Sequence, residues 1–163
     1  GLWKVFYPNG AINAEEMFAN GVLHGLSRYY DFDGKLQAKE IWANGMNHDS
    51  AWYYYPNGVL KRKGRYENGV YDGLWLNYFP SGALQQTGYY LNGFPEGVWK
   101  SYSEKGILLE EGNYSKSQRS GKFKYYHRKN GWLQFEGSFE NGERKGQWIE
   151  YRRNGKVKKY FQY

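Results

Sequence analysis

The sequence predicts an all-β protein, an elongated single antiparallel β-meander built from seven tandem β-hairpin repeats of 24 residues. Three observations predict this fold. Aromatic residues recur with a period of 24 residues, glycine-containing turn sequences recur between them, and the segments between turns are six or seven residues long. A fixed period of this length indicates an array of supersecondary units. Connections this short exclude crossover helices, so consecutive strands are expected to pair in sequence order.

The repeats divide the whole chain into seven units. A glycine opens six of them, whereas Asp49 opens the third, and the sixth contains one extra residue near Lys129. We expect a single repeat domain over 1–163, with the unit boundaries 1–24, 25–48, 49–72, 73–96, 97–120, 121–145 and 146–163. Because an isolated hairpin is marginally stable, each repeat is expected to depend on its neighbours.

Aromatic side chains mark both strands of each hairpin. The sixth position of the unit holds Phe6, Tyr30, Tyr54, Tyr78, Tyr102, Tyr126 and Tyr151, and the eighteenth holds Phe18, Trp42, Tyr66, Tyr90, Tyr114, Phe139 and Tyr163. The eighteenth position shares a strand face with the sixteenth, which is Gly64, Gly88, Gly112 or Gly137 in four repeats. We therefore expect an aromatic ring to lie over that bare backbone.

Two turn signals separate the strands. An Asn-Gly pair, first seen at Asn20-Gly21, occurs in five repeats and is replaced by Lys116-Ser117 in the fifth. The other turn contains a glycine in every repeat, as in Pro8 to Gly10. Tight hairpin loops need residues at positive φ, which glycine adopts without the steric penalty of a Cβ. Seven such hairpins predict about fourteen strands and no helix.

Composition limits the class of protein. Aromatic residues make up 21% of the 163 residues, too large a share for a disordered chain. The absence of cysteine excludes disulfides and thiolate metal sites. It leaves the compartment open between the cytoplasm and export from a bacterial cell, since a signal peptide could have been removed. No segment reaches the run of about 18 apolar residues that predicts a transmembrane span.

The segment Gly64 to Tyr78, GRYENGVYDGLWLNY, resembles MORN repeats. The spacing of 24 residues, with Pro-Asn-Gly at Pro8 to Gly10 and Pro56 to Gly58, is similar to the bacterial MORN-variant repeat, and the resemblance covers the whole chain. It implies a twisted antiparallel sheet used for protein association, with phospholipid binding claimed for eukaryotic members. Bacterial chains made only of variant repeats are similar to YwqK-like antitoxin proteins, proposed partners of polymorphic toxins.

Neither the histidines nor the carboxylates form a catalytic or metal-binding pattern. His24 and His48 occupy the same repeat position, but such positions are two strands apart, about 9.6 Å, whereas a shared zinc ion needs bonds of about 2.1 Å. Carboxylates that recur in register, such as Glu15 and Glu110, are typical of a solvated strand face. No Gly-x-Ser-x-Gly, His-Glu-x-x-His or phosphate-binding glycine loop is present. We therefore expect no enzymatic activity and no cofactor.

The last repeat is strongly basic. Its cations are Arg152, Arg153, Lys156, Lys158 and Lys159. They could contact an anionic surface, whether nucleic acid, acidic lipid or an acidic protein. The alternative is a polar cap that keeps the open array soluble and prevents edge-to-edge pairing, a role for which lysine is well suited. The sequence contains no specific nucleic-acid motif.

A second set of aromatic residues lies on the strand face opposite the sixth position. These residues are Tyr7, Tyr29, Tyr53, Tyr55, Phe79 and Tyr125. A single-layer sheet does not bury both of its faces, and exposed tyrosines are common anchors of protein interfaces. The set is therefore predicted to bind a protein partner, with the interface centred on Tyr29, Tyr53 and Tyr55. The alternative is that these rings only pack against one another across strands.

These observations favour a non-catalytic protein–protein interaction module, with a bacterial antitoxin or immunity-type protein as the form that the resemblance implies. The alternative is a cell-surface or wall-associated repeat protein that binds carbohydrate or anionic lipid through its aromatic and basic faces. Cell-wall-binding repeats also consist of aromatic and glycine-rich hairpins, but only Trp52 to Tyr55 matches their Trp-Tyr-Tyr sequence.

Overall fold

The computed structural model describes all 163 residues and is entirely β, with fifteen strands and no helix. The predicted fold class is therefore confirmed. The strands form two compact units, Gly1–Gly82 and Ala83–Tyr163, which we call the N-terminal and C-terminal units. The structure therefore contains no helix that could cross a membrane.

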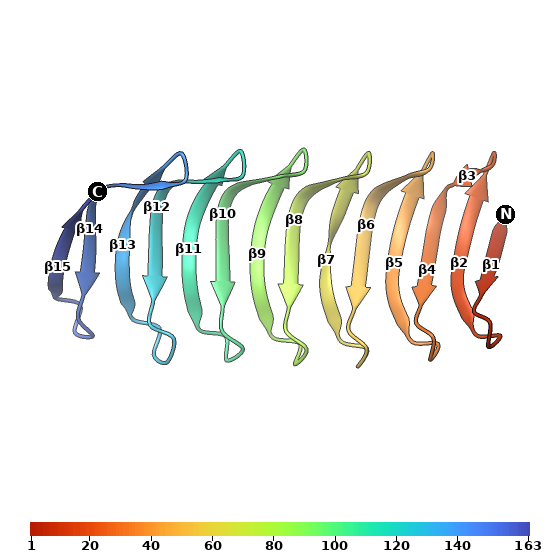
Figure 1. Ribbon diagram of the computed structural model, residues 1–163, viewed down its shortest axis with the longest axis horizontal. Coiled ribbons are helices and arrows are strands. Elements are labelled where there is room, and N and C mark those ends of the chain that lie inside the picture. Colours follow the sequence, from red (N-terminus) through yellow and green to blue (C-terminus); the bar gives the residue numbers. More distant parts are fainter. The chain divides into compact units, whose positions relative to one another are not determined.

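In the N-terminal unit, neighbouring strands are antiparallel and follow one another in sequence order, apart from one short strand (Figure 1). The strands are β1 (Leu2–Phe6), β2 (Ile12–Ala19), β3 (Val22–Leu23), β4 (Gly25–Tyr30), β5 (Leu36–Ala43), β6 (Met46–Tyr54), β7 (Leu60–Glu67) and β8 (Val70–Tyr78). The short β3 pairs only with β2. It accounts for the difference from the predicted fourteen strands, because His24 lies in neither β3 nor β4, whereas later repeats have one continuous strand here.

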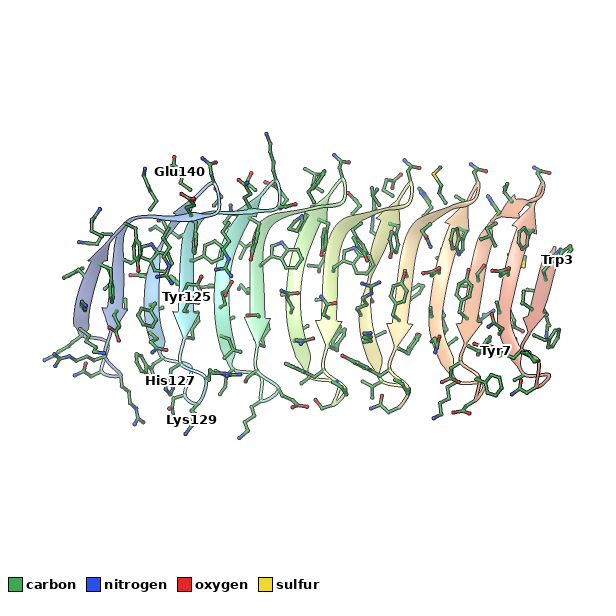
Figure 2. All side chains as sticks on the ribbon, in the orientation of Figure 1. Trp3, Tyr7, Tyr125, His127, Lys129 and Glu140 are labelled. Atoms are coloured by element: carbon green, nitrogen blue, oxygen red, sulfur yellow. The ribbon has the colours of Figure 1, made fainter.

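The C-terminal unit has the same antiparallel meander topology. Its strands are β9 (Leu84–Leu91), β10 (Phe94–Tyr102), β11 (Leu108–Ser115), β12 (Gln118–Tyr126), β13 (Leu133–Glu140), β14 (Glu143–Tyr151) and β15 (Val157–Gln162). The extra residue of the sixth repeat widens the turn between β12 and β13, where Lys129 lies (Figure 2). There the His127 and Trp132 rings stack with centroids 5.2 Å apart.

The turns adopt the backbone angles that their sequences predict. Asn20 and Gly21 lie at φ 51° and 80°, the left-handed pair of a tight hairpin turn. In the fifth repeat Lys116 and Ser117 adopt the same geometry, at 48° and 69°, although neither is glycine or asparagine. The Lys116 backbone N–H donates to Glu96 Oε2 at 3.0 Å, which ties this turn to β10.

The core is one aromatic ring deep. The third-position rings Trp75, Trp99, Phe123 and Trp148 are between 0 and 8% exposed. Each lies on the glycine of the preceding strand, respectively Gly64, Gly88, Gly112 and Gly137, so closely that a Cβ added there would overlap the ring. In contrast Trp3, whose strand β1 pairs only with β2, is 67% exposed.

An aromatic ring covers the glycine as predicted, but it is not the eighteenth-position ring from which the sequence pattern predicted this contact. The ring comes from the third position of the next repeat, which lies on the neighbouring strand. The eighteenth-position rings instead pack against it edge to face, as Tyr114 and Phe139 do against Phe123, at centroid distances of 5.7 and 4.8 Å. Glycine is required because the ring occupies the space of a side chain.

At the first two such contacts along the chain, the large and the small residue change places. Glu16 and Glu40 stand where later repeats have the glycine, and Ser27 and Ala51 stand where later repeats have the ring. Ser27 and Ala51 are almost completely buried, at 0 and 1% exposure. A small residue is therefore matched with a longer side chain on the adjacent strand, and the volume between strands stays filled.

We expect Gly112→Ala to lower the free energy of unfolding by about 1–3 kcal/mol, because the new methyl group must displace the fully buried Phe123 ring. Denaturant unfolding measures this loss. In a double-mutant cycle with Phe123→Ala, the alanine should cost less once the ring is gone. Additive effects of the two substitutions would contradict direct packing of the ring on this glycine.

Candidate functional site

The third and fifth positions of each repeat lie on one face of the sheet, because side chains alternate along a strand. We call this face the ring face. Its side chains include Ser27, Tyr29, Ala51, Tyr53 and Trp75 in the N-terminal unit, and Trp99, Ser101, Phe123, Tyr125 and Trp148 in the C-terminal unit. Each unit is a single-layer sheet, so no second layer covers this face.

The aromatic residues predicted to bind a partner are all partly buried, and several already use their hydroxyl groups within the chain. Tyr7 and Tyr55 each donate to a backbone carbonyl of the next repeat, those of Tyr30 and Tyr78, at 2.8 Å. Tyr7 also packs edge to face on Phe32, with centroids 5.3 Å apart. These tyrosines connect successive repeats, and their role in partner binding stays a prediction.

In the N-terminal unit the ring face holds a cluster of tyrosines and carboxylates. Tyr53 Oη donates to Glu40 Oε1 at 2.5 Å and lies 2.9 Å from Tyr66 Oη, while the Arg62 guanidinium stacks 4.3 Å from the Tyr53 ring. Burial and the Glu40 hydrogen bond raise the pKa of Tyr53. The tyrosine therefore stays protonated and acts as a hydrogen-bond donor.

Tyr29 occupies the equivalent place one repeat earlier. Its neighbours across the sheet are Ala14 on β2 and Ala38 on β5, both buried. Burial, together with the nearby carboxylates of Glu16 and Glu40, raises the pKa of Tyr29 to about 12.

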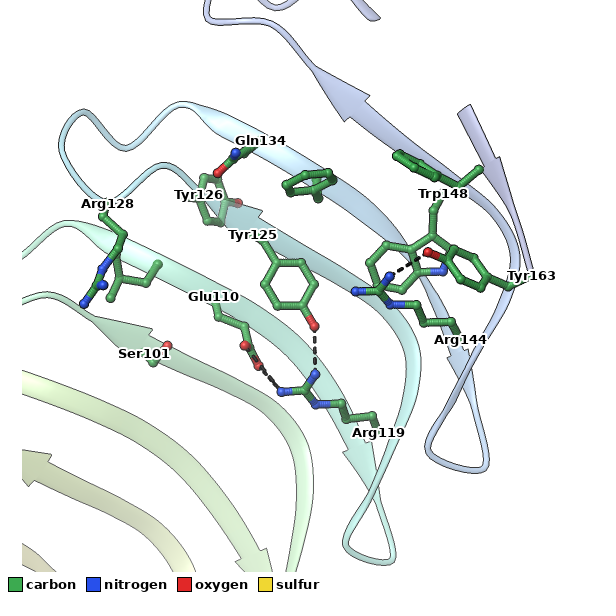
Figure 3. Close-up of a pocket in the computed structure, with 13 residues that line it drawn as sticks. Ser101, Glu110, Arg119, Tyr125, Tyr126, Arg128, Gln134, Arg144, Trp148 and Tyr163 are labelled. Carbon is green, nitrogen blue, oxygen red and sulfur yellow. Dashed lines mark hydrogen bonds and ion pairs between the residues drawn. The ribbon is translucent and has the colours of Figure 1, made fainter. Parts of the chain in front are cut away.

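In the C-terminal unit the ring face is hollowed into a pocket of about 700 Å³ (Figure 3). Its polar lining includes Glu110 from β11, Arg119 and Tyr125 from β12, and Arg144 from β14. Trp148, Phe135 and Phe161 contribute aromatic surface. A concave, largely aromatic site with a few convergent polar groups is the usual form of a ligand pocket.

The two arginines of the pocket have different surroundings. Arg119 is paired with Glu110, with 3.1 Å between Nη2 and Oε1, and its Nη1 donates to Tyr125 Oη at 2.8 Å. Arg144 is exposed; its Nη1 donates to Tyr163 Oη at 2.7 Å, and its guanidinium stacks 4.6 Å from the Trp148 ring. No carboxylate lies within 4.0 Å of Arg144.

The sequence prediction included Tyr125 but missed Arg119 and Arg144. The signal was available, because both arginines stand two residues before the opening glycine of the following repeat, at Gly121 and Gly146. Arginines at one repeat position on successive hairpins lie on the same sheet face.

The basic residues of the last repeat lie in and around the β14–β15 hairpin and are exposed or nearly so. Lys158 pairs with Glu150 at 2.7 Å, and Lys159 Nζ lies 4.7 Å from the Phe161 ring centroid. Arg152, Arg153 and Lys156 are exposed. No group of three or more His, Cys, Asp or Glu side chains is arranged to hold a metal ion. His48 lies 3.7 Å from Glu67 alone.

The sequence model of the MORN repeat variant family matches five segments of the chain, residues 1–20, 23–44, 53–68, 71–92 and 95–116. Together they cover more than half of the chain. The chain belongs to the MORN repeat variant family. Repeats of this family generally mediate interactions with proteins or with membrane lipids. The matched segments of this MORN-variant chain end at residue 116, whereas most of the pocket lining is formed by residues beyond it.

No curated protein matches the MORN-variant chain. Among solved structures it is similar to a GtfA/B complex bound to UDP and GlcNAc, with 16% identity and a TM-score of 0.30 over 63% of this chain. It is also similar to TarM, with 11% identity and a TM-score of 0.33 over 81% of this chain. In each case the chain spans 20% of the other protein's length.

The raised tyrosine pKa values predict a loss of stability at alkaline pH. An unfolded tyrosine releases its proton near pH 10, whereas folded Tyr29 does so only near pH 12. The unfolded state is therefore favoured increasingly between these values, and the free energy of unfolding should fall as the pH rises from about 10 to about 12. Denaturant titrations across this range should show a smaller fall for Tyr29→Phe than for the unmodified chain. Equal falls would contradict the assignment to Tyr29.

Proposed function

We propose that this chain is a non-catalytic protein-interaction module that binds its partner on the ring face. The observation that supports the proposal is the aromatic content of a sheet face that no second layer covers. Tyr29, Tyr53 and Tyr125 are half-buried there, so that each ring is held by its neighbours while part of its surface stays accessible. Rings held in this way offer contact area with little loss of conformational entropy on binding.

Two more specific roles fit this module. The resemblance to YwqK-like proteins favours an antitoxin or immunity-type role, which a toxin gene beside the coding sequence would support. A cell-surface role with an anionic ligand is supported only by the positive charge of the C-terminal unit. That unit has 15 Lys and Arg against 8 Glu and no Asp, whereas the N-terminal unit has 8 basic and 8 acidic residues.

The test of the module begins with affinity capture from the source organism, mass spectrometry of the bound proteins, and calorimetry with the purified partner. Replacing both Tyr53 and Tyr55 by Ser should weaken the binding by about 2 kcal/mol or more, because the rings are lost. Replacing both by Phe keeps the rings and removes internal hydrogen bonds. It should lower the free energy of unfolding by about 1 kcal/mol per bond and leave the affinity nearly unchanged.

Trp52→Ser is the matched control, because Trp52 is adjacent to Tyr53 in β6 and points to the opposite face. Full affinity in a folded Tyr53 and Tyr55 serine variant would exclude these two rings as anchors. An equal loss with Trp52→Ser would show that the ring face is not the binding surface.

A further inference from the structure

We propose that the pocket of the C-terminal unit binds a carboxylate side chain from an acidic, partly apolar segment of the protein partner, with Arg144 as the principal contact. The inference rests on the proposed function and names the chemistry of the partner. Arg144 points into the pocket from β14, on the same face as Arg119 from β12 (Figure 3).

Arg144 is positioned and only partly used. A guanidinium carries five N–H donors, and the hydrogen bond to Tyr163 engages one of its nitrogens. The guanidinium lies over the Trp148 ring, 4.6 Å from its centroid, and this contact restrains the group while other N–H donors stay available. An arginine fixed in this way is suited to two parallel hydrogen bonds with a carboxylate, because less side-chain freedom is lost on binding.

Arg119 shows the same recognition within the chain. Its guanidinium pairs with the Glu110 carboxylate and donates to the Tyr125 hydroxyl, as Arg144 donates to Tyr163. The carboxylate is the component that the Arg144 site lacks. A partner carboxylate at Arg144 would reproduce the arrangement already formed one hairpin earlier.

The charged groups of the pocket favour an anionic ligand. Three arginines, Arg119, Arg128 and Arg144, line it together with Glu110. The Glu110 carboxylate already neutralises Arg119, which leaves the positive charges of Arg128 and Arg144 to attract an anion. The excess of basic over acidic residues in this unit attracts an acidic protein at longer range.

The aromatic lining indicates what lies next to the carboxylate. Phe135, Trp148 and Phe161 contribute to the wall of the pocket. They would cover the methylene groups of a Glu and an adjacent apolar side chain, which free phosphate and a sugar headgroup lack. The pocket therefore fits an acidic segment in which carboxylates alternate with apolar residues.

The test uses the full chain and a fluorescein-labelled peptide of alternating glutamate and leucine, with binding followed by fluorescence anisotropy. Arg144→Gln should weaken binding about tenfold or more, because a hydrogen-bonded charge pair is lost. Arg144→Lys should give an intermediate loss, since an ammonium provides the charge without the paired donors. The fold is checked by circular dichroism, because Arg144 is exposed but its guanidinium lies over the buried Trp148 ring.

Lys145→Gln is the matched control. Lys145 is the next residue of β14, points to the opposite face and pairs with Glu140 at 3.5 Å. Lys145→Gln removes the same charge as Arg144→Gln. If the pocket binds the peptide, the peptide affinity of the Lys145→Gln variant should stay within about twofold of that of the unmodified chain. Equal losses for Arg144→Gln and Lys145→Gln would overturn the proposal in favour of general charge attraction.

Three further outcomes would also overturn the proposal. The first is equal binding of a glutamine-for-glutamate peptide, the second is displacement of the peptide by equimolar inorganic phosphate, and the third is binding of phosphatidylserine vesicles with the same dependence on Arg144. If the captured partner binds the Arg144→Gln variant with full affinity, the proposal that the pocket binds an acidic segment is wrong, whereas the proposed protein-interaction function is not contradicted. Absence of any partner of the unmodified chain contradicts the proposed function instead.

Discussion

In each later repeat an aromatic ring lies flat on the bare backbone of a glycine in the neighbouring strand, as Phe123 does on Gly112. A sheet of one layer has no interior, and this contact supplies most of the buried large side chains, including the two most deeply buried rings, Phe123 and Trp148. Because ring and glycine belong to successive repeats, no repeat completes its core alone. Folding stability is therefore expected to be a sum of contacts between neighbours.

The same constraint explains how the two units present different chemistry on an equivalent face. In the first two repeats a glutamate replaces the glycine, and the ring of the following repeat is replaced by Ser27 or Ala51. The carboxylates of Glu16 and Glu40 then lie among tyrosines, and burial together with these carboxylates raises the pKa of Tyr29 and Tyr53. In the C-terminal unit the rings remain, and arginines stack against them. One backbone thus places glutamates among tyrosines in its first repeats and arginines over aromatic rings in the later ones.

Much of the fold could be predicted from the sequence, because the period and the turn residues act through local backbone geometry. Asn20 and Gly21 lie in the left-handed region that their turn requires, and the strands follow in the predicted order within each unit. The contacts between side chains could be predicted less well. The period places Tyr55 on a strand end, but only the structure shows that its hydroxyl donates to Tyr78. The pocket was missed because it depends on how Arg119 and Arg144 turn toward aromatic rings of adjacent strands.

The placement of each ring on the glycine of the preceding repeat also defines where the chain is modular. Gly64 and Trp75 belong to different sequence repeats but to one hairpin, formed by β7 and β8. A block of one repeat length that begins at an opening glycine such as Gly73 contains Trp75 but not Gly64. A block that begins in the turn at Pro56 to Gly58 contains both residues. Natural duplication and deliberate lengthening of the array should therefore tolerate junctions at the Pro-Asn-Gly turns, so that each inserted block carries both surfaces of its own core contact.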